Sequence, residues 1–177
     1  PVDMAVITVP KQHVLAVAEE CGQAGVRGLT VISAGFREVG GEGVERERQL
    51  MEVVHRHRMR MIGPNCMGVL NADPAVSMNA TFAPSMPPFG RAGFVSQSGA
   101  MGLSVLDYAK EYGIGISQFV SMGNKPDVSG NDLLLGDAMG TPLQYEGADL
   151  LDGGLGGDTL KGGGGADMLL GGGGNDI

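Results

Sequence analysis

Residues 93–121, GFVSQSGAMGLSVLDYAKEYGIGISQFVS, contain the pattern that decides the fold class of this chain. Residues 94–96 form a short apolar strand, residues 98–99 a turn, and residues 100–112 have the apolar spacing of an amphipathic helix. A second apolar strand follows at residues 116–121. Because parallel strands need a long crossover, usually a helix, this stretch predicts a strand-helix-strand unit of an α/β protein.

The same alternation of strands and helices precedes this unit. The predicted elements are strands at residues 3–9, 29–33 and 60–62, and helices at residues 11–21 and 44–57. Continuous apolar strands between amphipathic helices predict a parallel sheet covered on both faces. Residues 71–90 have little periodicity and four prolines, so we expect a structured connection between two lobes.

Composition and charge exclude two classes of partner. The chain has 177 residues and a formal net charge of −8, and no basic face is visible that could bind a nucleic acid backbone. No apolar run approaches the roughly 20 residues that would span a membrane. The two cysteines match no metal or disulfide spacing. The first residue is not a methionine, and we expect the chain to be part of a longer protein.

Two turns follow predicted strands and are candidate ligand sites. Gly63-Pro64-Asn65-Cys66 lies at the carboxyl end of a strand, where parallel sheets bind ligands, although it can also be read as a turn alone. Ser98 and Gly99 begin a helix directly after a strand, so unpaired N–H groups and the positive end of the helix dipole favour an anion there. The alternative is that Ser98 only caps the helix.

Six motifs carry a resemblance to a known family. In chain order they are VDMAVITVP, ECGQAGVRGLTVISAGF, MRMIGPNCMGVLN, NATFAPSMPPFG, GFVSQSGAMG and SMGNKPDVSGNDLL. They resemble the NDP-forming acyl-CoA synthetases, a superfamily that includes the succinyl-CoA synthetase alpha subunit. The resemblance covers residues 1–134 and implies a partial Rossmann-like CoA-binding domain at 1–70, a connection at 71–89 and a partial flavodoxin-like ligase domain at 90–134.

The resemblance also implies binding residues and partners. The residues that would contact coenzyme A are Val9, Pro10, Ile32, Ser33 and Ala34. Ser98 and Gly99 would bind phosphate, at the start of the helix that steadies the family's phosphohistidine. The expected partners are CoA or a phosphate group, and a beta or nucleotide-binding subunit or domain. Such an acid–thiol ligase would be cytoplasmic.

Two parts of the family's machinery have no match in this sequence. The family's glycine-rich phosphate loop lies upstream of the segment matching Pro1, and its phosphohistidine lies downstream of the segment ending near Leu134. His13, His55 and His57 match no catalytic motif, and we expect them at the surface. The resemblance therefore implies a partial CoA surface, and we expect no ligase turnover from this chain alone and no catalytic residue within it. The acyl substrate and the nucleotide are not predicted.

The last residues follow a different, nine-residue pattern. GGLGGDTLK at 153–161 is followed by GGGGADMLL and GGGGNDI. Such a strict period predicts one stacked structural unit. Glycine pairs permit tight turns, and aspartate supplies the hard oxygen ligands that calcium prefers. The alternative is a disordered glycine-rich linker.

This pattern, at residues 144–177, resembles the calcium-binding nonapeptide repeats of RTX proteins, which form a parallel β-roll. The predicted Ca²⁺ ligands are Asp149, Gly154, Gly156, Asp158, Gly163, Gly165, Asp167 and Asp176. A second hypothesis for the whole chain follows, namely a secreted RTX-type protein, working outside the cell, in which the α/β part is not catalytic. Residues 135–143 would be a junction. The stretch GNDLL at 130–134 fits both families, and we hypothesise that they were joined there, by recombination or by faulty assembly of sequence reads.

Overall fold

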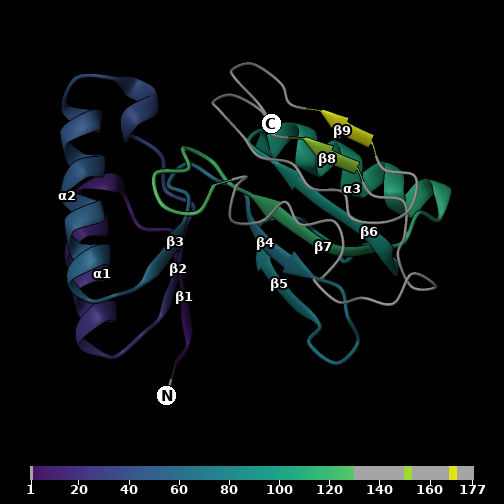
Figure 1. Ribbon diagram of the computed structural model, residues 1–177, viewed down its shortest axis with the longest axis horizontal. Helices are drawn as coiled ribbons and strands as arrows, with labels where there is room; N and C mark the ends of the chain where they lie inside the picture. Colours follow the sequence, from purple (N-terminus) through teal and green to yellow (C-terminus); the bar gives the residue numbers. More distant parts are fainter. Residues whose placement is uncertain (1, 130–149, 153–167, 171–177) are drawn as a thin grey trace.

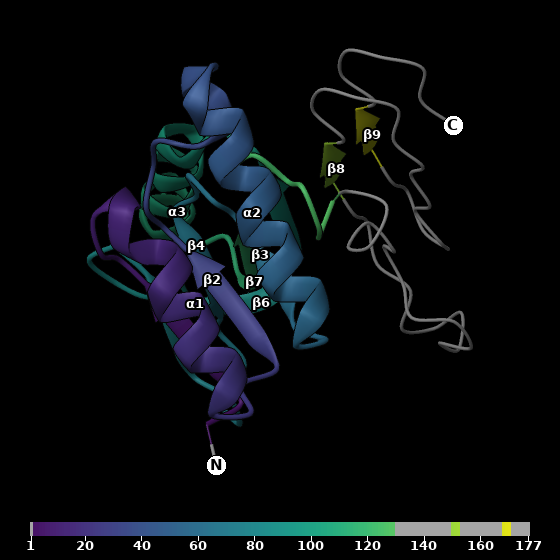
Figure 2. The ribbon, with the colours of Figure 1, turned by 90° about the vertical axis from the view of Figure 1, so that its left-hand side faces the viewer.

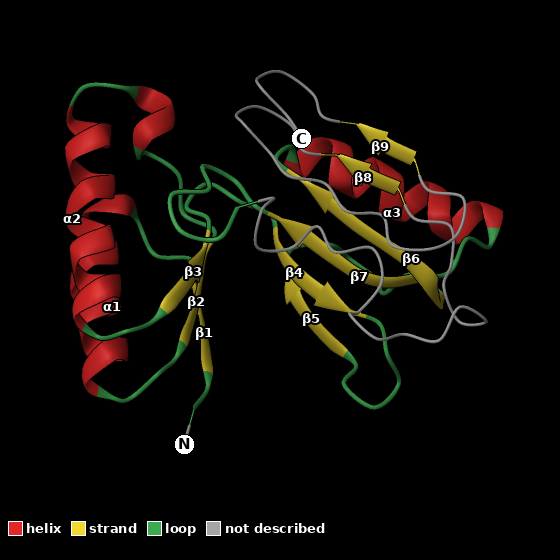
Figure 3. Cartoon of the chain, viewed as in Figure 1, coloured by secondary structure: helices red, strands yellow, loops and turns green. Residues whose placement is uncertain are grey.

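The computed structural model describes residues 2–129, 150–152 and 168–170, and most of these belong to two α/β lobes (Figure 1). Each lobe has its own sheet, and the helices of each lobe cover that sheet (Figure 3). The predicted α/β class is confirmed. Within the described residues, no helix is both long and apolar enough to cross a membrane.

The first lobe is a parallel three-stranded sheet with two helices. Its elements are β1 (Met4–Ile7), η1 (Lys11–His13), α1 (Val14–Gln23), β2 (Gly28–Val31), η2 (Arg37–Val39), α2 (Glu42–Arg56) and β3 (Arg60–Ile62). The strands lie in the order β1-β2-β3, each parallel to the next. These elements match the predicted ones in type and order, and differ from them by a few residues at their ends.

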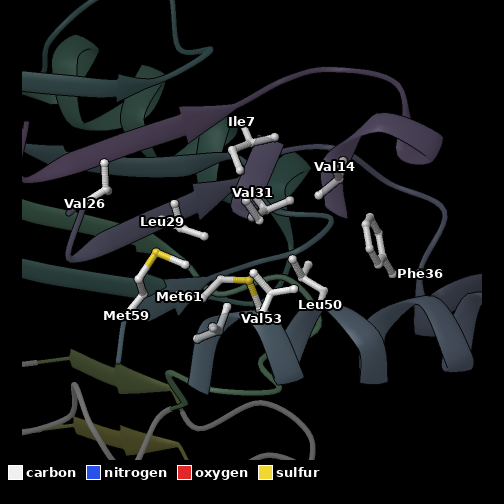
Figure 4. Packing of buried hydrophobic residues seen from close by; sticks show 12 residues of the cluster. Ile7, Val14, Val26, Leu29, Val31, Phe36, Leu50, Val53, Met59 and Met61 are labelled. Carbon is white, nitrogen blue, oxygen red and sulfur yellow. The ribbon is translucent and has the colours of Figure 1, made fainter. Parts of the chain in front are cut away.

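The two helices α1 and α2 lie side by side on the same face of this sheet (Figure 2). We expected helices on both faces, and for the described residues this was wrong. The reason is topological: right-handed crossovers that step in one direction across a sheet, from β1 to β2 to β3, place their helices on one side. The core lies between this face and the helices, where Ile7, Val31 and Leu50 are at most 2 % exposed (Figure 4).

The second lobe is a mixed four-stranded sheet. It contains β4 (Gly68–Asn71), β5 (Met78–Thr81), β6 (Phe89–Ser96), α3 (Gly99–Tyr112) and β7 (Ile116–Ser121), with the strands ordered β5-β4-β7-β6. β6 and β7 are parallel, which confirms the predicted strand-helix-strand unit. β4 is antiparallel to both of its neighbours. The segment that we expected to be a connection therefore contains strand β5.

Close packing of α3 on this sheet depends on a glycine. Phe94 and Phe119 stack with their ring centroids 5.5 Å apart, and Phe119 is fully buried. A Cβ atom on Gly102 would lie 2.5 Å from Cζ of Phe119, which is closer than such atoms can approach. The absence of a side chain at Gly102 thus lets α3 lie directly on the ring.

Two short strands are described in the repeat region. β8 (Leu150–Asp152) and β9 (Met168–Leu170) pair in parallel. Leu150 pairs with Met168, eighteen residues later, which is two periods of the nine-residue repeat. A parallel roll whose every coil uses two repeats would give this register. The other residues of the predicted roll lie outside the described part of the chain.

Candidate functional site

The carboxyl ends of the three strands of the first lobe are joined by hydrogen bonds. The hydroxyl of Ser33, just after β2, donates to the carbonyl oxygen of Val9 at 2.5 Å, just after β1. The backbone N–H of Asn65, just after β3, donates to the carbonyl oxygen of Ser33 at 3.0 Å. Ser33 is thus the link between all three loops, at the edge of the sheet where parallel sheets bind ligands.

The residues that the sequence assigned to CoA are brought together at this edge. Pro10 and Ala34 are exposed, while Val9, Ile32 and Ser33 are half-buried. The sequence could predict this grouping because strands that are parallel and adjacent end side by side. The turn at Gly63–Cys66, which the sequence analysis named as a candidate ligand site, borders the same surface.

The turn at residues 63–66 is tightly packed against β2. Gly63 has a φ of +91°, and a Cβ atom there would lie 2.3 Å from the carbonyl oxygen of Val31. The thiol of Cys66 donates to that same oxygen at 3.3 Å. Burial raises the pKa of the Cys66 thiol to about 11, so the group stays protonated at neutral pH. Cys66 is a packing residue and is poorly suited to act as a nucleophile.

The start of α3 lies next to this turn. The side chain of Ser98 caps the helix and accepts from the N–H of Met101 at 3.3 Å. A Cβ atom on Gly99 would lie 3.2 Å from Cβ of Met67, the residue that follows the turn. Ser98 is exposed, and the first-turn N–H groups of a helix have no partner within it. The structure therefore combines the predicted cap with a geometry that can accept an anion.

Sequence reasoning gave no role to the loop after β7, which forms hydrogen bonds with the first lobe. The carboxylate of Asp127 in this loop accepts two hydrogen bonds, one from the backbone N–H of Met61 at 2.6 Å and one from Nε of Arg60 at 3.1 Å. The N–H of Val128 donates to the carbonyl oxygen of Met61 at 3.2 Å, so this loop pairs with the free edge of β3. The signal available in the sequence was the motif SMGNKPDVSGNDLL, but no rule connects it with β3.

The predicted calcium ligands all lie outside the described residues. In the described ranges, no three His, Cys, Asp or Glu side chains are grouped as a metal site would require. Of the histidines, His13 and His55 are exposed as expected. His57 is partly buried and contacts Glu19, with 2.9 Å between Nε2 and Oε1. The hydrogen bond from His57 lowers the pKa of the Glu19 carboxyl group.

Comparison with known families finds three matches. Residues 1–72 match a profile described as a CoA binding domain, and residues 89–138 match one described as a succinyl-CoA ligase like flavodoxin domain. Residues 145–177 match the RTX calcium-binding nonapeptide repeat. The three matches follow the order of the three regions interpreted from the sequence.

Similar proteins include acid–CoA ligases of archaea. The chain is 47 % identical over 133 residues to "Acetate--CoA ligase [ADP-forming] I" of Archaeoglobus fulgidus. The aligned residues cover 75 % of this chain and 19 % of that protein. The same identity over the same length is found with "Acetate--CoA ligase [ADP-forming] I subunit alpha" of Pyrococcus furiosus, of which 28 % is covered. The chain thus spans less than a third of the length of these relatives.

Solved structures of acyl-CoA synthetases are also similar to this chain. The apo form of "dinucleotide forming Acetyl-coenzyme A synthetase 1" of Ca. Korarchaeum cryptofilum superposes with a TM-score of 0.74 at 41 % identity. The superposition covers 85 % of this chain and 32 % of that one.

Proposed function

Because residues 1–134 belong to the NDP-forming acyl-CoA synthetase superfamily, we propose that this chain supplies the CoA-contacting surface of an acid–thiol ligase. CoA would lie along the strand-end loops of the first lobe, against Val9, Pro10, Ile32, Ser33 and Ala34. Its phosphate groups, or a free phosphate, would be within reach of the start of α3 at Ser98 and Gly99. The chain's contribution would be binding and positioning.

One observation carries this proposal. The hydrogen bonds of Ser33 to the loops after β1 and β3 give one continuous surface at the edge of the sheet where ligands of parallel sheets bind. Two features of this surface suit a nucleotide-like ligand. Its rim includes exposed residues such as Pro10 and Ala34, and the nearby helix start offers backbone donors for negative charge.

Substitution of Ala34 by glutamate is expected to weaken CoA binding by about tenfold or more, because a charged side chain would occupy the proposed contact surface and repel an anionic ligand. The measurement is isothermal titration of CoA into the full chain. Ala75→Glu is the matched control, since Ala75 is also exposed but lies in the turn between β4 and β5. The two variants carry the same net charge.

The control variant is expected to bind CoA as the original chain does. Equal weakening in both variants would assign the effect to net charge and contradict a site at Ala34. Absence of any CoA heat in the original chain would contradict the proposed function itself.

We propose calcium binding as a second function, carried by the repeat region. It is supported by the match of residues 145–177 to the RTX repeat and by the eighteen-residue register between β8 and β9. The proposed ligands are the aspartates and glycines given above, from Asp149 to Asp176. Such repeats would bind calcium where it is abundant, outside the cell, whereas CoA chemistry is cytoplasmic. The two functions thus favour different compartments.

Addition of millimolar calcium is expected to increase the β signal in the circular dichroism spectrum of the full chain. The physical reason is that the repeat's closely spaced carboxylates repel one another until a cation binds between them. Magnesium at the same concentration is the control, because it prefers a smaller octahedral site that keeps its water ligands. An unchanged spectrum with calcium, or an equal change with magnesium, counts against a calcium-specific roll.

The names of relatives in the same family suggest a protein partner for this chain. The relative from Pyrococcus furiosus is named as a subunit alpha, and we propose that this chain works with a nucleotide-binding subunit or domain. The surface made by the strand-end loops and the start of α3 would then face the partner's phosphate donor.

A further inference from the structure

The loop that follows β2 is held by the side chain of Glu38. This carboxylate accepts the backbone N–H of Gly35, and that of Phe36 at 3.1 Å. Gly35 directly follows Ala34, and its carbonyl oxygen accepts from the Arg46 guanidinium of α2. Phe36 is fully buried. The shape of the proposed CoA contact at Ile32–Ala34 therefore depends on where the Glu38 carboxylate lies.

The Glu38 carboxylate is itself held from the second lobe, by Asn124 in the loop after β7. Nδ2 of Asn124 donates to Oε2 of Glu38 at 2.7 Å and to Oε2 of Glu47 at 3.0 Å. An amide nitrogen has two protons, so both are used by these two carboxylates. Burial would raise the pKa of Glu38, but the hydrogen bonds from Asn124 and from the Gly35 and Phe36 N–H groups outweigh it and lower that pKa.

Asn124 is fixed in place by the turn after β3. Its backbone N–H donates to the carbonyl oxygen of Pro64 at 2.9 Å, and its side-chain oxygen accepts from Nδ2 of Asn65 at 3.4 Å. Glu47 is 1 % exposed and also accepts Nε of Arg37 at 2.6 Å, so this end of the network cannot shift freely. Asn124 thus connects the turn after β3 with the loop after β2.

We propose that Asn124 is a positioning residue that sets the affinity of the CoA surface through Glu38. This proposal rests on the proposed CoA-binding function. Asn124 acts on the loop at Ile32–Ala34 through another side chain, because it orients the carboxylate that holds the next two N–H groups of that loop. The second lobe would in this way determine whether the strand-end surface of the first lobe has its binding shape.

Reversal of the hydrogen-bond polarity separates this role from a general loss of structure. Asn124→Asp places a third carboxylate against Glu38 and Glu47. Glu38→Gln places an amide nitrogen against the amide nitrogen of Asn124. In the double variant, the new amide at position 38 can keep its oxygen on the Gly35 and Phe36 N–H groups and donate from its nitrogen to the new carboxylate at position 124. The contact between positions 38 and 124 is then restored with donor and acceptor exchanged, whereas the carboxylate at position 124 still faces Glu47, as it does in Asn124→Asp.

The experiment is isothermal titration of CoA into the full chain and these three variants. Each single substitution is expected to weaken binding by about tenfold or more, because each loses at least one hydrogen bond to a charged group. Independent effects would multiply to about a hundredfold, whereas the restored contact predicts a double variant that binds CoA more tightly than Asn124→Asp, which has the same contact with Glu47. Asn79→Asp is the control, because the Asn79 side chain forms hydrogen bonds with Thr81 and Ala83, in and just after β5, and unchanged CoA affinity is expected.

A second measurement does not need CoA. Hydrogen exchange of the Gly35 and Phe36 amides, followed by NMR in the ligand-free chain, should be faster in each single variant than in the original chain, and slower in the double variant than in Asn124→Asp. Multiplying affinity losses, or unchanged exchange at Gly35 and Phe36 in Asn124→Asp, would overturn the positioning role. If the original chain binds no CoA, the proposed function fails, and the exchange pattern still decides whether Asn124 acts through Glu38.

Discussion

Replacement of Gly63 by alanine is expected to destabilise the chain by about 3–5 kcal/mol, from a left-handed backbone that alanine disfavours and a collision with buried backbone. The φ of Gly63 is +91°, and the added Cβ would lie 2.3 Å from the carbonyl oxygen of Val31. Neither group can move away easily, because Gly63 is buried and its N–H donates to the carbonyl oxygen of Met122 at 3.2 Å. Urea denaturation measures the loss of stability.

Gly25→Ala is the matched control for this substitution. Gly25 has a similar φ of +82°, but nothing lies within 4 Å of the position that its Cβ would take. The control is expected to lose about 1–2 kcal/mol, the effect of the backbone conformation alone. A similar loss for both variants would show that the close approach between Gly63 and Val31 has no energetic effect, and would contradict the packing described for the turn.

The local pattern of the sequence was sufficient to predict the strands and long helices of the first lobe and the central unit of the second. The strand β3 has the predicted bounds, Arg60–Ile62, and the helix α3 ends at the predicted Tyr112. Both are set by nearby signals: apolar runs, helical spacing and the glycine at position 113, whose φ of +67° ends the helix.

The strand β5 could not be predicted in the same way. Its sequence, MNAT, has no long apolar run, and it is followed by three of the four prolines of the expected connection. What makes it a strand is its pairing with β4, which in turn pairs with β7, about fifty residues further along the chain. A pairing between such distant segments leaves little trace in local periodicity.

The residues of the candidate site likewise include some that the local sequence could indicate and others that it could not. The grouping of Val9, Ser33 and the turn after β3 follows from strand topology, so the sequence could indicate it. The contributions of Asn124 and Asp127 could not be found, since both act across the boundary between the lobes. Polar residues in a loop rich in glycine and proline look like ordinary surface residues until their partners are known.

Substitution of Asp127 by alanine is expected to destabilise the chain by about 2–3 kcal/mol, chiefly because the N–H of Met61 would be left without its acceptor. Met61 is 1 % exposed, so water cannot easily replace the carboxylate oxygen that lies 2.6 Å from this N–H. The ion pair with Arg60 adds little, since the Arg60 side chain is 59 % exposed. Urea denaturation of the full chain measures the effect.

Two further variants test whether the loss of stability comes from the buried hydrogen bond. One tests the contribution of the charge of Asp127, and the other tests the effect of removing an aspartate from an exposed turn. Asp127→Asn keeps an acceptor oxygen, and should therefore retain more than half of the stability lost by Asp127→Ala. Asp73→Ala removes an aspartate that also accepts a backbone N–H, from Ala75 at 2.8 Å, but in an exposed turn where water can take its place. Its cost should be about 1 kcal/mol or less. A loss in Asp127→Asn as large as in Asp127→Ala would assign the link between the lobes to the ion pair with Arg60, and the pairing of this loop with β3 would then depend on salt concentration.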